Sequence, residues 1–409
     1  MRALLEVARE DRPFCRLESG PFRCFIVTDP EVAAKALTGP GELYRRTPDL
    51  AFWFPPAGEG VASSPHEKWK RQRRLLAPYF KASAEDRLAA ITEGEAKRLI
   101  ARITDDGPVV DLQALVMETT LRTAVQHLLV KPFPGPSGRI SEAIQTAMHY
   151  ATPGRAIRYR VLAPVNRPLA RRFLHPRAKR RALAVLDAFV DEMIATARKE
   201  VSVRAPLMEG LLDAESMGLL DEGELRDQVA TFLVAAVDSV GSAVTWTQWQ
   251  LAQESGHAER AGQDPVHAEA CALESMRLIP PLWIYWREMR REEELAGLSL
   301  RKGDLVVFVP FVVHMRPDIW PDPEQFLPDR FLNGAGTTGI DAYAYLPFGH
   351  GAHACLGRRM AISEARILTH QLQEHFRFEL QDRPRGEAPV EVRVAVLMDG
   401  GMPVRAERR

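Results

Sequence analysis

The sequence predicts a mainly α-helical protein with small peripheral β-sheets. Apolar residues recur with helical periodicity through residues 84–130 and 139–200, where few β signals occur. A mostly apolar run from Val229 to Trp246 predicts one further, long helix. The alternating patterns typical of strands are confined to residues 15–29, a run after Pro281, and residues 390–407.

Composition and charge are those of an ordinary globular protein. The 409 residues are 46% hydrophobic and 26% charged, which provides ample core-forming material. The formal net charge is zero, so no bulk attraction to nucleic acid is expected. The four cysteines form no C-x-x-C pair, so neither a zinc site nor a disulfide framework is indicated. Residues 1–14 are rich in charge and hold no apolar run long enough for a membrane anchor, so we expect a cytoplasmic protein.

Turn and capping residues mark the shorter elements. Residues 15–29 are predicted to form a hairpin that turns at Ser19-Gly20-Pro21, and Asp29-Pro30 is predicted to open a helix. Residues 254–266, ESGHAERAGQDPV, are predicted to form a loop. The last strands are predicted to form one hairpin that turns at Asp399-Gly400-Gly401.

The long helix is predicted to begin at Asp221, because Asp221 and Glu224 have the spacing of a capping box. Its apolar run is long enough to raise the question of a membrane span. Asp238 lies in the middle of the run, and a charge there costs about 2.5–3.5 kcal/mol on insertion scales. We therefore expect a core helix, within a single domain of residues 1–409 that has no fused redox domain.

The loop Phe348-Gly349-His350-Gly351-Ala352-His353-Ala354-Cys355-Leu356-Gly357 carries the strongest functional signal. Cys355 directly precedes a helical pattern, and the dipole and free N–H groups of a helix N-terminus favour an ionised thiolate. The glycines let the backbone turn sharply and pass close to a flat group. Phe348 is expected to shield the sulfur, and His353 to direct a ring N–H toward the same place. Such a thiolate suits an axial ligand to haem iron, whereas the alternative is a buried, inert cysteine.

This loop resembles the haem-thiolate loop of the cytochrome P-450 monooxygenases. The chain is similar to that family over residues 20–405, with four motifs in the family's order. The resemblance implies haem b (iron protoporphyrin IX) as the cofactor and Cys355 as the iron ligand. Trp69 and Arg73, four residues apart on one helix face, match the W-x-x-x-R that holds a haem propionate in the family. Arg287 matches the arginine of the second propionate, and His353 is implied to bind a propionate as well.

Two further motifs extend the resemblance to a structural cluster. Glu274-Ser275-Met276-Arg277 matches the family's E-x-x-R, and the later P-x-R-F piece supplies Arg330. The resemblance implies that these three side chains form a buried Glu–Arg–Arg cluster. Removing one member should be severe, because it leaves a buried charge without its partner.

Residues 235–239 align with the family's oxygen-activation motif. The resemblance implies that Asp238 and Ser239 are catalytic and relay protons to dioxygen bound at the iron. Two residues depart from the family pattern: Ala236 stands where glycine is common, and Ser239 where threonine is usual. Serine keeps the hydroxyl but lacks the methyl group that fixes its rotamer.

The function that the resemblance implies is that of a soluble haem-thiolate monooxygenase. It would insert one oxygen atom from dioxygen into a small apolar organic substrate, in secondary metabolism, with electrons from a separate ferredoxin and reductase. One alternative is a haem-thiolate enzyme without monooxygenation: a peroxide-driven oxidase, an oxidative coupling enzyme or an isomerase. Another is a non-catalytic haem- or ligand-binding protein, which the Asp238–Ser239 pair disfavours.

Strand alternation predicts the substrate-facing residues. If Arg287 reaches a propionate, residues two and four positions earlier share its strand face. Leu282, Ile284 and Trp286 are then expected to point into the core. Large aromatic side chains there would leave a narrow, flat pocket, so we expect an aromatic or polycyclic substrate. The residues expected to contact substrate are Trp283, Tyr285, Ala235 of the central helix, and Phe52 and Phe54 of an aromatic loop.

Two basic regions predict charged partners. The first comprises Lys68, Lys70, Arg71 and Arg74, with Arg358 and Arg359 beside the cysteine. We expect it to form one cationic face for an acidic ferredoxin, the alternative being a solvated basic helix. The second, Arg155 to Arg181, contains no acidic residue and would attract an anionic or carrier-bound substrate, the alternative being a solvated lid.

Overall fold

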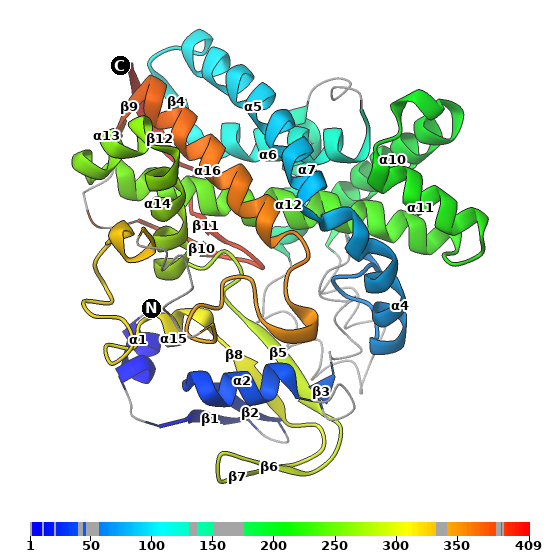
Figure 1. Cartoon of the computed structure of the whole chain (residues 1–409), viewed down its shortest axis with the longest axis vertical. Helices are drawn as coiled ribbons and strands as arrows, with labels where there is room; N and C mark the ends of the chain where they lie inside the picture. The colour runs from blue at the N-terminus through cyan, green and yellow to red at the C-terminus, as the bar shows by residue number, and fades with distance from the viewer. Residues whose placement is uncertain are drawn as a thin grey trace. The chain divides into compact units, whose positions relative to one another are not determined.

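Helices predominate in the part of the chain that the structure describes, and its strands form small sheets, as the sequence predicts (Figure 1). The structure is a computed structural model that describes residues 2–9, 12–19, 22–39, 44–45, 57–130, 137–150, 176–332, 342–381, 386 and 388–409. Its elements fall into two compact units. Unit 1 comprises Met1–Thr47, Trp246–Glu379 and Glu407–Arg409, and unit 2 comprises Pro48–Thr245 and Leu380–Ala406.

Unit 1 combines a β-sheet with short helices. Its helices are α1 (Arg2–Arg9), α2 (Pro30–Thr38), α13 (Ser255–Gln263), α14 (Pro265–Leu278), α15 (Pro310–His314) and α16 (Arg358–His375), with 3-10 turns η4 (Pro328–Phe331) and η5 (Gly351–His353). Its strands are β1 (Phe14–Ser19), β2 (Phe22–Val27), β3 (Tyr44–Arg45), β5 (Tyr285–Met289), β6 (Glu293–Leu295), β7 (Leu298–Leu300) and β8 (Leu305–Phe308), and β9 (Phe376–Leu380) follows α16.

The main sheet of unit 1 has the strand order β1-β2-β8-β5-β3 and a hydrophobic cluster on each face. Alternate residues of β2 divide between the faces, with Phe25 in one cluster and Ile26 in the other. β8 divides in the same way at Phe308 and Val307. The predicted N-terminal hairpin is present as antiparallel β1 and β2. The predicted cap is present too, because the Asp29 carboxylate accepts hydrogen bonds at the start of α2.

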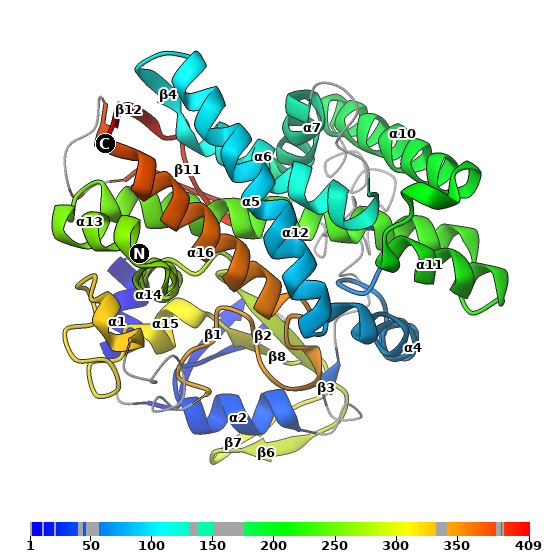
Figure 2. The same ribbon diagram turned by 45° about the horizontal axis from the view of Figure 1, so that its top comes forward.

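Unit 2 is largely helical (Figure 2). Its elements are α4 (His66–Leu76), η2 (Ala77–Phe80), α5 (Ala82–Asp105), β4 (Val109–Asp111), α6 (Leu112–Leu128), α7 (Ser137–His149), α10 (Arg177–Lys199), η3 (Val201–Val203), α11 (Pro206–Ser216), β10 (Val390–Val392), β11 (Val396–Met398) and β12 (Pro403–Arg408). The long helix α12 (Glu222–Leu251) belongs to unit 2 up to Thr245.

The predicted start and environment of α12 are confirmed. Its capping box is closed by two hydrogen bonds, from Glu224 N to Asp221 Oδ1 at 2.7 Å and from Asp221 N to Glu224 Oε2 at 3.1 Å. The helix is long and apolar enough to span a membrane by composition, but 78% of its most apolar 18-residue window is buried inside the protein. It therefore fits a core helix.

Two local predictions are wrong. Residues 255–263 form helix α13 rather than a loop, because packing supplies what the helix propensity of Gly256 and Gly262 lacks. A Cβ atom on Gly262 would lie 2.6 Å from the Gln373 carbonyl oxygen, so glycine permits the close approach to α16. At the C-terminal end, β10 pairs with β11, and Asp399-Gly400-Gly401 instead leads into β12, which pairs with β4. Asp111 accepts a hydrogen bond from Met402 N at 2.9 Å and holds the chain there.

Candidate active site

Cys355 lies on a loop between η5 and α16, two residues before the helix N-cap Gly357. Its side chain is exposed, whereas Cys271 is buried. The Cys355 N–H donates to the Phe348 carbonyl oxygen at 2.9 Å, which closes the loop. Gly351 has a φ of +70°, and a Cβ atom there would lie 2.1 Å from the Leu37 carbonyl oxygen of α2. Glycine is therefore required where the loop packs on α2.

Side chains on both sides of Cys355 brace this loop. The Arg358 guanidinium lies over the Phe348 ring, 5.7 Å from its centroid, at cation–π distance. On the approach to the loop, Leu346 N donates to His314 Nε2 at 2.8 Å, and the His314 Nδ1–H donates to the Arg277 carbonyl oxygen at 2.9 Å. Burial lowers the pKa of His314 to about 3, so the ring is neutral and has one donor and one acceptor. It ties the thiolate loop to α14.

The predicted Glu–Arg–Arg cluster is present in unit 1. Glu274 and Arg277 are fully buried on α14 and form two hydrogen bonds, at 2.8 and 2.9 Å. Arg330 of η4 adds a third contact, from Nε to Glu274 Oε1 at 3.3 Å. Arg277 also donates to the His314 carbonyl oxygen at 2.8 Å and lies over the Trp320 ring. The cluster therefore fixes the segments that lead toward Cys355.

Arg287 and Tyr285 lie on the same face of β5. Arg287 is buried and donates to the Trp286 carbonyl oxygen at 2.9 Å, and burial lowers the pKa of Arg287 to about 10. The Tyr285 ring stacks on Phe308 with centroids 5.2 Å apart, and its buried hydroxyl has no hydrogen-bond partner among the described residues. Burial raises the pKa of this hydroxyl. Trp283 precedes β5, which begins at Tyr285, so the strand alternation predicted for Trp283 does not extend to it. For the same reason the prediction that Leu282 points into the core is wrong, and its side chain is exposed.

In unit 2, α4 brings Trp69 and Arg73 together as their spacing predicts. The Trp69 side chain is 5% exposed, and the Arg73 guanidinium carbon lies 5.9 Å from the centroid of its ring. The His66 ring lies 5.5 Å from that of Trp69. The indole N–H and the guanidinium therefore come from one side of α4, which suits a carboxylate acceptor.

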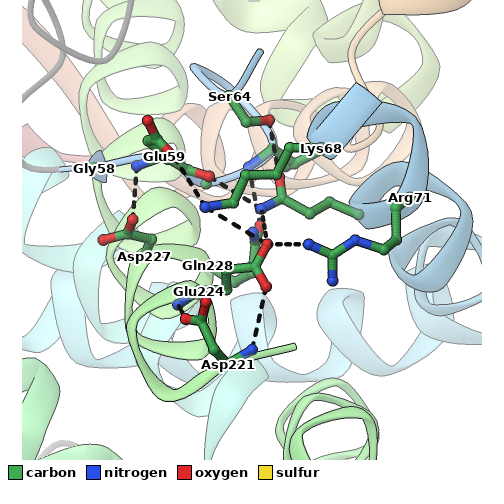
Figure 3. Close-up of polar contacts among 12 residues, drawn as sticks. Gly58, Glu59, Ser64, Lys68, Arg71, Asp221, Glu224, Asp227 and Gln228 are labelled. Carbon is green, nitrogen blue, oxygen red and sulfur yellow. Dashed lines mark hydrogen bonds and ion pairs between the residues drawn. The ribbon is translucent and has the colours of Figure 1, made fainter. Parts of the chain in front are cut away.

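Polar contacts fix α4 to the first turns of α12 (Figure 3). Glu224 is buried, and its carboxylate accepts a hydrogen bond from Arg71 and lies 3.6 Å from Lys68 Nζ. Lys68 also pairs with Glu59 at 2.9 Å. Burial opposes ionisation of Glu224, but the Asp221 N–H, Arg71 and Lys68 outweigh it and hold the pKa of Glu224 below its usual range. Of the four basic α4 residues predicted for a ferredoxin surface, two, Lys68 and Arg71, are therefore already paired with carboxylates.

The segment before α4 is held by the same part of α12. Glu59 N donates to Asp227 Oδ2 at 2.7 Å, as Figure 3 shows, and Val61 N donates to Gln228 Oε1 at 3.0 Å. A Cβ atom on Gly60 would lie 2.0 Å from Thr231 Oγ1, so the backbone passes directly over the helix. The sequence pattern did not indicate this contact, because its residues are far apart in the chain.

The middle of α12 combines an accessible surface with a buried carboxylate. Ala235 is exposed, and Ala236 and Ser239 are partly exposed, on a helix that is otherwise mostly buried. The Ser239 hydroxyl donates to the Ala235 carbonyl oxygen at 2.6 Å. Asp238 is 3% exposed, and neither carboxylate oxygen has a hydrogen-bond partner among the described residues. Burial raises the pKa of Asp238 to about 6.

The residues present fit a haem group. Arg287 is a buried cation that has no carboxylate within ion-pairing distance in the described part of the chain, and a propionate would supply one. In unit 2, the Trp69 indole and the Arg73 guanidinium together suit a carboxylate such as a propionate. In unit 1, the exposed Cys355 would provide a thiolate for iron. Among the described residues no group of three His, Cys, Asp or Glu side chains could hold a metal ion directly.

Some predicted residues lie outside the described part of the chain. Phe52 and Phe54 are among them, as is the basic region from Arg155 up to residue 175. Arg177 and the residues after it begin α10. The sequence also gave no signal for Arg393, which lies between β10 and β11 and interacts with Asp238.

Comparisons with known proteins identify a matching family and fold. The chain matches the family described as "Cytochrome P450" over residues 2–265 and 266–398. Cyclooctat-9-en-7-ol 5-monooxygenase of Streptomyces melanosporofaciens is 29% identical over 389 residues, covering 88% of this chain and 81% of that protein. Pentalenene oxygenase of Streptomyces avermitilis is 26% identical over 378 residues, covering 86% of this chain and 81% of that protein. The fold is similar to the crystal structure of CYP175A1 from Thermus thermophilus, with a TM-score of 0.78 and 24% identity over 99% of this chain and 94% of that one.

Proposed function

Because the chain belongs to the cytochrome P450 family and is a cytochrome P450 monooxygenase, we propose that it uses haem b, ligated by Cys355, to hydroxylate or epoxidise a small apolar organic substrate. The bound haem supplies an iron centre that takes up dioxygen and electrons. For hydroxylation, one C–H bond, one dioxygen molecule, two electrons and two protons give one C–OH group and one water molecule. The electrons come from a separate reduced ferredoxin and its reductase, in the cytoplasm.

The observation that carries this proposal is the accessible surface in the middle of α12. Ala235 and Ala236 leave room beside the helix, and Ser239 places a hydroxyl at the same surface. Asp238 is buried behind them with a pKa raised to about 6, so it can exchange a proton near neutral pH. In this proposal Ser239 orients the proton donor at the reacting oxygen, and Asp238 resupplies the proton.

Two observations support a substrate class: the aromatic residues of the candidate site and the names of the relatives. The relatives are named for oxygenating cyclooctat-9-en-7-ol and pentalenene. Of the two classes that the aromatic residues indicate, aromatic and polycyclic, these names favour a polycyclic alkene or alkenol. Trp283, Tyr285 and Ala235 are the described residues proposed to contact it. A small apolar substrate of this kind fits a pocket with few polar groups.

Turnover with isotopically labelled dioxygen tests the function. With ferredoxin, its reductase and a polycyclic alkene selected by a spectral binding screen, one labelled oxygen atom should enter the product. The same reaction driven by hydrogen peroxide, without reductant, should be much slower. Faster turnover with peroxide would favour a peroxide-driven oxidase, and a product that contains no labelled oxygen would favour oxidative coupling or isomerisation.

A further inference from the structure

The face of α12 that carries the buried Asp238 carboxyl also carries a serine that contacts a β-hairpin. Ser242 lies one turn later on that face and donates a hydrogen bond to the Val396 carbonyl oxygen of β11 at 2.6 Å. The β10–β11 hairpin is therefore packed against the part of α12 that carries Asp238, and both belong to unit 2. Figure 1 shows the two strands beside α12.

The turn of this hairpin presents a guanidinium that is held from two sides. Arg393 donates to Glu391 Oε2 at 2.5 Å and to the Gln145 carbonyl oxygen of α7 at 3.1 Å. The other Glu391 oxygen accepts a hydrogen bond from the Nδ1–H of His149, at the end of α7, at 2.6 Å. Arg393 is largely buried, with 12% of its side chain exposed, whereas His149 is 54% exposed. These hydrogen bonds thus link His149, near the protein surface, through Glu391 to Arg393.

The charges around Asp238 are few. Arg393 and Glu391 are the charged groups of the hairpin that act on the Asp238 carboxyl, with opposite signs. α7 contributes His149, whose ring donates a hydrogen bond to Glu391. α6 contributes Thr120, which contacts the Val237 carbonyl oxygen, and Met117, which packs on Gly241, and neither carries a charge. No described side chain donates a hydrogen bond to Asp238, so its ionisation depends first on burial, which disfavours the charged form, and then on the charges of Arg393 and Glu391.

We propose that Arg393 is a positioning residue for Asp238: its guanidinium, held by Glu391 and by the Gln145 carbonyl, sets the balance between the ionised and neutral forms of the Asp238 carboxyl. Burial tends to raise the pKa of Glu391, but the hydrogen bonds from Arg393 and His149 outweigh it, so Glu391 remains an anion that anchors Arg393. The consequence for catalysis rests on the proposed function, in which Asp238 delivers protons. The electrostatic coupling between Arg393 and Asp238 is independent of that role.

Infrared titration of the ferric protein tests the coupling without turnover. The carbonyl stretch of protonated Asp238 is assigned as the band that Asp238→Asn removes, and its intensity is followed against pH. Arg393→Gln removes a cation and should raise the pKa of Asp238 by about one unit, as expected for a nearby opposite charge. Glu391→Gln removes an anion and should lower the pKa of Asp238. Arg393→Lys keeps the charge and should restore most of the wild-type value.

The outcomes separate this inference from the proposed function. An unchanged Asp238 titration in Arg393→Gln, or shifts of the same sign in Arg393→Gln and Glu391→Gln, would overturn the inference. If Arg393→Gln does not fold, Glu391→Gln tests the inference alone: a lowered pKa of Asp238 supports it, and a raised or unchanged pKa overturns it. If the titration shifts as expected but the pH profile of turnover does not follow it, the coupling stands and the proton-delivery role of Asp238 fails.

Discussion

The guanidinium of Arg277 and the carboxylate of Glu274 are both fully buried and share two hydrogen bonds, at 2.8 and 2.9 Å. The pair is three residues apart on α14, and Arg330 reaches the same carboxylate from η4. Such a pair is weak evidence for net stability, because burying both charges has already cost desolvation energy. Removing either partner, however, leaves the other as an unpaired buried charge, which strongly destabilises the folded protein.

Glu274→Ala should therefore destabilise the protein strongly. It leaves the buried Arg277 without its counter-ion, which costs about 3–5 kcal/mol. The measurement is the urea midpoint of the ferric protein by circular dichroism. Arg260→Ala is the matched control, because it breaks the exposed Arg260–Asp329 pair, worth less than about 1 kcal/mol. Equal midpoints for the two variants would contradict the structural role of the buried cluster.

Cys355→His should abolish the red-shifted Soret band of the reduced carbonyl complex while some haem remains bound. The imidazole can ligate iron but does not donate electron density as a thiolate does. Cys271→Ala serves as the control, because Cys271 is buried in the core and burial raises the pKa of its thiol. Loss of the band in the Cys271 variant, with Cys355→His normal, would show that the wrong cysteine has been assigned.

Most of the fold, and the parts of the site that depend on local spacing, could be predicted from the sequence. The capping box at Asp221 and Glu224 and the pairing of Glu274 with Arg277 depend on residues three apart, which a helix places together. Helix α13 was missed because its stability comes from packing on α16 rather than from its own sequence. The surroundings of Asp238 were missed for a related reason, since Arg393 and Glu391, whose charges act on it, come from a distant part of the chain.

Asp238→Asn should stabilise the protein at neutral pH while impairing turnover. The folded-state pKa of Asp238 is raised from 3.8 to about 6, so the folded protein loses stability relative to the unfolded chain as the pH rises through this window. The shift corresponds to about 3 kcal/mol above pH 6, which the amide avoids. Turnover should fall by about 10²-fold or more if a proton donor is lost, with substrate affinity nearly unchanged.

The pH dependence of the stability gain distinguishes removal of the buried Asp238 charge from a stabilising effect that is unrelated to its ionisation. The stability difference between Asp238→Asn and wild type should be small near pH 4 and largest at pH 7 to 8, measured as urea midpoints. Asp213→Asn, an exposed substitution on α11, is the control and should show no such trend. A variant that is less stable than wild type at pH 8 would mean that the ionised carboxylate contributes to stability.

Reduction by ferredoxin should depend on Lys70 and Arg74 more than on Lys68. Lys70 and Arg74 are exposed on α4, whereas Lys68 is paired with Glu59 and Glu224. Lys70→Glu with Arg74→Glu should slow reduction by an acidic ferredoxin about tenfold at low salt, and the difference should shrink as salt rises. Reduction by dithionite should not change. Arg139→Glu with Arg181→Glu, on α7 and α10, provides the matched charge reversal. Equal slowing in both double variants would indicate that only net charge matters.

Tyr285→Phe and Trp283→Ala should change substrate affinity or product regiochemistry and leave the carbonyl spectrum intact. The Tyr285 hydroxyl is buried without a hydrogen-bond partner among the described residues, so Tyr285→Phe keeps the stack on Phe308 and removes only that donor. Loss of one hydrogen bond to substrate should weaken binding about three- to tenfold. Ile284→Ala and Trp286→Ala are the controls, because both side chains pack against the cluster on the opposite face of the sheet and should affect stability alone. If those controls alter regiochemistry while Tyr285→Phe and Trp283→Ala do not, the opposite face of β5 lines the substrate pocket.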